Sequence, residues 1–83
     1  MMQLEILTPD KSIFSGDVTL VKVPGSNGSF EILKNHAAII STLTAGDVKA
    51  VTESGETVHF QITGGVAEVK KNRILILAEA IEK

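Results

Sequence analysis

The sequence predicts an all-β domain, a small β-sandwich or barrel. Apolar and polar residues alternate with a period of two in several segments, and turn-forming residues recur roughly every 8–12 residues. The 83 residues are enough for one domain, 1–83, and 43% of them are hydrophobic, although Trp, Tyr and Cys are absent. Val, Ile, Leu and Ala must therefore fill the core. A domain of this size keeps a stability of about 5 kcal/mol.

The first half of the chain contains strand patterns separated by turns. Leu4 and Ile6 alternate with polar neighbours, so one face of this strand is buried. Residues 18–23 carry apolar side chains on both faces, as in a central strand or one that passes from the core to a partner's surface. Asn27-Gly28 is the strongest hairpin signal, because both residues tolerate the positive φ of a type I′ turn.

An unusual corner, Asn-His-Ala-Ala, occupies residues 35–38. A single helical turn capped by Asn35 is one interpretation. The β-branched residues Ile39 and Ile40 instead favour a strand directly after the corner.

The second half predicts four further strands. Val58, Phe60 and Ile62 alternate with polar residues, whereas residues 74–77 are apolar on both faces. Gly64-Gly65 interrupts a continuous β pattern and indicates a bulge or a bend between sheets. Residues 78–83 have helical propensity but are too few for a stable isolated helix. The expected strands are 47–52, 57–63, 65–70 and 73–78, separated by Ser54-Gly55, Gly64-Gly65 and Lys71-Asn72.

Charge and hydropathy exclude several function classes. The net charge is −2, and Lys70, Lys71 and Arg73 form the only basic cluster, which argues against a nucleic-acid-binding face. No apolar run approaches the roughly 20 residues that span a bilayer, and the N-terminus lacks a signal-peptide pattern. We expect a soluble chain that reaches a membrane only through another protein.

The residues that carry chemistry do not form a catalytic or metal-binding pattern. The two histidines, His36 and His59, lack the spacing of a metal site, and there is no cysteine. His59 is expected on the exposed face of its strand. His36 is expected to bond the backbone of its corner or to lie at an interface. Gly25-Ser26-Asn27-Gly28 is expected to be a hairpin turn rather than a phosphate-binding loop. We therefore predict neither an enzyme nor a cofactor.

A series of short motifs runs along the whole chain in a specific order. They are Phe14-Ser15-Gly16, the Gly25–Gly28 turn, Leu33-x-Asn35-His36-Ala37, Leu43-Thr44-Ala45-Gly46, Gly64-Gly65-Val66-Ala67-Glu68-Val69 and the segment 72–79. In this order the chain resembles the epsilon subunit of the F-type ATP synthase (delta in mitochondria), specifically its N-terminal β-sandwich domain.

The resemblance implies a flattened sandwich or barrel of about ten short strands in two sheets. It also implies a non-catalytic subunit at the foot of the central stalk, a rotor part that links the gamma subunit to the c-ring and couples proton translocation to ATP synthesis in the catalytic head. Its place would be peripheral, on the cytoplasmic face of the energy-coupling membrane. The implied c-ring contacts are Ser26, Asn27, Gly28 and Ser29, and the implied gamma contacts are Thr8, His36 and Ser41.

The chain departs from the family's usual pattern at its end and in its corner. Most relatives continue into two C-terminal helices, whereas this sequence stops at Lys83, either as a naturally short subunit or as a fragment. Lys34-Asn35 replaces a common Pro-Gly or Pro-Asn, Ala38 replaces a proline, and Glu31 replaces a glycine. Two other functions stay open: a biotinyl- or lipoyl-like carrier modified on Lys70 or Lys71, and an adaptor that uses the same fold with another partner.

Overall fold

The computed structural model describes residues 2–82, and this range contains nine strands and no helix. The predicted all-β class is confirmed, and the strands expected in the second half lie within a residue of their predicted bounds. The strands are β1 (Met2–Leu7), β2 (Ser12–Val23), β3 (Phe30–Leu33), β4 (Ile39–Leu43), β5 (Gly46–Thr52), β6 (Thr57–Ile62), β7 (Gly65–Lys70), β8 (Arg73–Ala78) and β9 (Ile81–Glu82).

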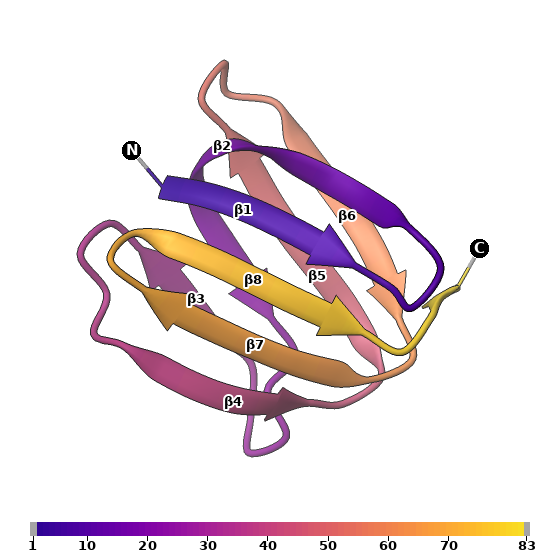
Figure 1. Ribbon diagram of the computed structural model, residues 1–83. Coiled ribbons are helices and arrows are strands. Elements are labelled where there is room, and N and C mark those ends of the chain that lie inside the picture. The colour runs from indigo at the N-terminus through magenta and orange to yellow at the C-terminus, as the bar shows by residue number, and fades with distance from the viewer. Residues whose placement is uncertain (1, 83) are drawn as a thin grey trace.

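The strands form one sheet that folds over into two layers (Figure 1). Along the sheet the order is β4-β7-β8-β1-β2-β5-β6-β9, and β3 pairs with β2 beside this path. We call the layer of β4, β7, β8 and β1 the first layer, and the layer of β3, β5 and β6 the second layer. Strand β2 belongs to both, because it pairs with β1 over Ser12–Val18 and with β5 and β3 over Val18–Val23. A register shift between Val18 and Leu20 lies where β2 passes between layers.

The core lies between the layers and is made of aliphatic side chains. Alternation places them there: Leu4 and Ile6 are buried while Gln3 and Glu5 are exposed, as predicted. No polar or charged residue is buried among residues 2–82, so hydrophobic burial holds the layers together. The buried residues are Met2, Leu4, Ile6, Val18, Val21, Val23, Ile32, Leu43, Val48, Ala50, Ile62, Ala67, Val69, Ile74, Ile76 and Ala78.

The bend expected at Gly64-Gly65 is present. It joins β6 of the second layer to β7 of the first layer, and the Gly64 carbonyl accepts a hydrogen bond from the Glu79 backbone at 2.9 Å. After Ala78 the chain crosses back and ends in β9, which pairs with β6 through Ile62 and Ile81. The helical propensity of this end is therefore overridden by the sheet.

The predicted type I′ turn at Asn27-Gly28 is wrong. Such a turn needs positive φ at both central residues, and of these two only Gly28 has it, at 125°. The strands on either side first pair at Val23 and Phe30, so a six-residue loop, 24–29, connects them. The two-residue turn with positive φ at both positions is Lys71-Asn72, at 52° and 60°.

The helical turn at the corner is also absent. Residues 36–38 form no helical turn. Asn35 has a φ of 66°, and the His36 N–H donates to the Leu33 carbonyl at 3.0 Å. The four residues from Leu33 form a β-turn whose third residue requires positive φ, a conformation that asparagine tolerates. The strand expected after the corner, β4, is present.

Candidate interaction surfaces

The loop 24–29 is fastened to the end of β4 by its own backbone. The Ser26 N–H donates to the Thr42 carbonyl at 3.0 Å, and the Thr44 N–H donates to the Pro24 carbonyl at 2.8 Å. Between these bonds Gly25 forms a bridge with Leu43. A Cβ atom on Gly25 would lie 2.6 Å from the Gly28 carbonyl oxygen and 2.9 Å from the Phe30 ring, so only glycine fits.

The four residues implied to face the c-ring are all exposed, but their side chains are not equally available. The Ser26 hydroxyl accepts a hydrogen bond from the Thr42 hydroxyl at 2.9 Å, so it already serves the fold. The side chains of Asn27 and Ser29 make no hydrogen bond within residues 2–82. Asn27 and Ser29 therefore present free polar groups on a fixed loop.

The corner 34–38 presents His36, which is half-buried. Its Nδ1 lies 2.7 Å from the Ala37 carbonyl and donates to it, and its ring packs near Phe30 with centroids 6.4 Å apart. The expected bond from this histidine to the corner's backbone is thus confirmed. The Asn35 N–H donates to Oδ1 of Asn72 at 2.7 Å, and Nδ2 of Asn72 donates to Oδ1 of Asn35 at 3.3 Å.

The three residues implied to contact gamma are not brought together into one cluster. Thr8 follows β1 directly, where Leu7 pairs with Leu77, and its amide donates to Lys11 at 2.9 Å. The corner of His36 is bonded to Asn72, at the other end of β8. Five strand residues separate these ends, about 17 Å. Ser41 lies between them on β4, opposite Ala67.

The outward side of the first layer carries an apolar patch that the sequence prediction did not assign to a site. Strand pairing places Val66, Leu77 and Leu7 side by side, because directly opposite residues share a face. In the next row of the same face, Glu68 lies between Ile40 and Leu75. Ile40 is 72% exposed and Leu77 is 48% exposed, which is unusual for side chains of this size. We call this set the outer apolar face: Leu7, Ile40, Val66, Leu75 and Leu77. In the sequence, the sign of this face is that residues 74–77 carry apolar side chains on both sides of their strand.

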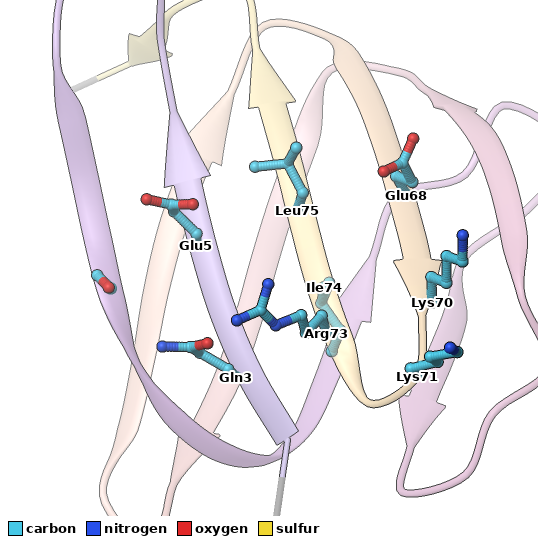
Figure 2. A pocket seen from close by; sticks show the side chains of 9 residues that line it. Gln3, Glu5, Glu68, Lys70, Lys71, Arg73, Ile74 and Leu75 are labelled. Carbon is cyan, nitrogen blue, oxygen red and sulfur yellow. The ribbon is translucent and has the colours of Figure 1, made fainter.

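A charged border lies beside the outer apolar face, toward the Lys71-Asn72 turn. Figure 2 shows Lys70, Lys71 and Arg73 along one end of a shallow hollow. Glu5 and Glu68 lie next to Leu75 on the same surface. The hollow therefore carries both positive and negative side chains. A partner that covers the hollow must place polar groups against them.

The remaining candidates for chemistry do not assemble into a site. His59 is exposed, as predicted, and its Nδ1 lies 2.8 Å from a carboxylate oxygen of Asp47. Residues 2–82 contain no group of three or more His, Cys, Asp or Glu that could hold a metal ion. Within the same range no helix is long and apolar enough to cross a membrane. The features that stand out are the bonded loop 24–29, the corner 34–38 and the outer apolar face.

Comparison with protein families and known sequences agrees with the two-layered β-sandwich described above. The family model described as "ATP synthase, Delta/Epsilon chain, beta-sandwich domain" matches residues 1–83. An ATP synthase epsilon chain of Chlorobium limicola is 40% identical over 79 residues, which are 95% of this chain and 90% of that protein. One of Pelotomaculum thermopropionicum is 38% identical over 81 residues, 98% of this chain. The chain spans 60% of the length of that relative.

Solved structures share the fold at low sequence identity. A chain in the Euglena gracilis mitochondrial ATP synthase, OSCP/F1/c-ring in rotational state 1, superposes with a TM-score of 0.88 at 20% identity. The alignment covers 98% of this chain and 52% of that one. A chain from the central stalk/c-ring structure of the Tetrahymena thermophila mitochondrial ATP synthase gives 0.80 at 21% identity, covering 99% and 66%. Both contain the same sandwich.

Proposed function

The chain belongs to the family of ATP synthase delta/epsilon chain β-sandwich domains, and from this premise we propose that it is a non-catalytic rotor subunit of an F-type ATP synthase. In this role it joins the gamma subunit to the c-ring and turns with them. It thereby couples proton translocation to ATP synthesis in the catalytic head. The observation that carries the proposal is the family match, which extends over every residue of the chain.

The geometry supports a role in transmitting force. Within residues 2–82, nine strands form a two-layered sandwich, and backbone hydrogen bonds tie the loop 24–29 of the second layer to β4 of the first layer. Densely packed interiors have low compressibility and pass strain on rather than absorb it. A rotor adaptor needs this property, because an internal hinge would lose torque.

The outer apolar face supports gamma as the partner on the first layer. It lies on strands between Thr8 and the corner of His36, so one partner that covers it reaches both predicted contacts. Burying exposed aliphatic side chains such as Ile40 and Leu77 supplies the main favourable term in protein association. We propose that gamma covers this face, and that Asn27 and Ser29 meet the loops of the c-ring.

The proposed location follows from the partners. The subunit would lie on the cytoplasmic face of the energy-coupling membrane and be peripheral, held there through gamma and the c-ring. It would contribute no catalytic group and bind no cofactor.

Extraction of membranes with mild detergent tests the assignment. We expect the chain to co-purify with gamma and the catalytic subunits at constant stoichiometry. If it never accompanies them, the rotor proposal is wrong and a free adaptor is favoured. Intact mass on the same sample tests the carrier alternative, since a biotinyl or lipoyl addition on Lys70 or Lys71 would contradict a rotor role.

A matched pair of variants tests which face gamma covers. Leu77 on the first layer and Leu33 on the second are exposed to 48% and 49%. We expect Leu77→Glu to weaken binding of purified gamma by at least about tenfold, because a charge would be buried in an apolar contact. Leu33→Glu should have a smaller effect. The reverse order would move the gamma interface to the second layer.

A further inference from the structure

Asn72 is held rigidly by the sheet. It is the second residue of the two-residue turn between β7 and β8. The Lys70–Arg73 pair closes the ladder of these two strands next to the turn. The backbone carbonyl of Asn72 also accepts a hydrogen bond from the Gln3 N–H of β1 at 3.0 Å. Three strands therefore fix its position, and its side chain extends from a firm base toward the corner 34–38.

Apart from the packing of the His36 ring near Phe30, the corner has few contacts that hold it. Its residues form no ladder with a strand, and the His36 N–H bonds only back to Leu33. Within residues 2–82, the hydrogen bonds that link the corner to a distant part of the chain are the two that join Asn35 and Asn72, which lie 37 positions apart. Asn35 is exposed and Asn72 is half-buried, so water can replace both hydrogen bonds when the two residues separate.

We propose that Asn72 is a positioning residue that holds the corner 34–38, and with it His36, in one conformation ready for a partner. The inference rests on the proposed function for the identity of that partner, the gamma subunit. The physical basis is preorganisation: a loop already ordered before binding loses less conformational entropy when the complex forms. The amide pair takes the place of rigidity that the Lys34-Asn35 sequence does not supply by itself.

The two amides are not equivalent, and this gives the proposal a sharp test. Oδ1 of Asn72 accepts a backbone N–H at 2.7 Å, whereas Oδ1 of Asn35 accepts only the longer bond of 3.3 Å. Asn35→Gly keeps its backbone donor and loses only the longer bond. Asn72→Gly loses both. Glycine tolerates the positive φ at either site, so both variants can retain the turn.

The controls come from the same turn. Lys71→Gly removes a side chain at a neighbouring position with a φ of 52° and leaves the amide pair intact, so it reports the cost of a glycine alone. Asn72→Asp keeps an oxygen that accepts the Asn35 N–H, so it should hold the corner nearly as well as Asn72 does. Asn35→Gly combined with Asn72→Gly should resemble Asn72→Gly, because the shorter bond is already lost.

Amide hydrogen exchange measured by NMR on the full chain tests the clamp without a partner. We expect Asn72→Gly to speed exchange at Asn35 and His36 by about threefold to tenfold, with smaller effects for Asn35→Gly and none for Lys71→Gly. Unchanged exchange in Asn72→Gly would overturn the clamp. An equal increase in Lys71→Gly would do the same, since the turn and not the amide would then be responsible.

Affinity for purified gamma tests the positioning role. We expect Asn72→Gly to weaken binding by about threefold to tenfold, and Asn72→Asp to recover most of it. Faster exchange at the corner with unchanged gamma affinity would overturn positioning. Failure of the unmodified chain to bind gamma would instead contradict the proposed function, while the exchange data would still decide whether the clamp exists.

Discussion

The loop 24–29 and the corner 34–38 lie only a few residues apart but are held in different ways. The loop is fastened to β4 by backbone bonds through Ser26 and Thr44. The corner is fastened by the side chain of Asn72, which accepts from the Asn35 backbone and donates to the Asn35 side chain. Backbone bonds survive most substitutions, and side-chain bonds do not. Substitutions should therefore disturb the loop mainly at positions that require glycine. They should disturb the corner mainly at Asn35 and Asn72.

The largest effect is expected from Gly25→Ala. Its Cβ would lie 2.6 Å from the Gly28 carbonyl oxygen, so the backbone of the loop must shift and its bonds to β4 would weaken. We expect a loss of about 2–3 kcal/mol in the free energy of unfolding, measured by urea denaturation. An unchanged midpoint would mean that the loop yields easily and that the contrast with the corner is false.

A smaller loss is expected from Gly28→Val. Space around Gly28 is open, but its φ of 125° strains a β-branched residue. We expect about 1–2 kcal/mol of destabilisation in a thermal melt. Ser54→Ala, in the β5–β6 turn, serves as the control and should change stability less. Equal melting temperatures for the two variants would contradict the assigned loop conformation.

The corner should affect binding more than stability. We expect His36→Ala to weaken gamma binding by about threefold to tenfold, measured by calorimetry, while the melting temperature changes little. His59→Ala is the comparison, because its bond to Asp47 lies on the exposed side of the second layer and such pairs contribute at most about 1 kcal/mol. Indistinguishable affinities would remove His36 from the interface.

The smallest effect is expected from Thr42→Val. It removes the bond from the Thr42 hydroxyl to Ser26, and valine keeps the β-branched shape. Because the backbone bonds of the loop persist and the hydroxyl is exposed, we expect a loss of at most about 0.5 kcal/mol in the same denaturation assay. A loss as large as that of Gly25→Ala would show that side chains, and not backbone, hold the loop.

The turns show where sequence prediction succeeded and where it could not. Period-two alternation placed Val58, Phe60 and Ile62 on one face, and the structure confirms it, with Ile62 fully buried. The Asn27-Gly28 signal was real as a turn but wrong in type, because β4 holds the chain there in a longer loop. A local signal reports what two residues tolerate, and the contacts of the loop decide which conformation they adopt.

The sequence by itself determined the all-β class, most strand positions and the family, because these depend on alternation, turn residues and the order of motifs along the chain. Only the tertiary structure decided which surfaces exist. Leu77 and Ile40 come to lie on one outer face, and Asn35 meets Asn72, through pairings between segments far apart in sequence. Such pairings depend on how the sheet folds over into two layers, and no local pattern specifies that.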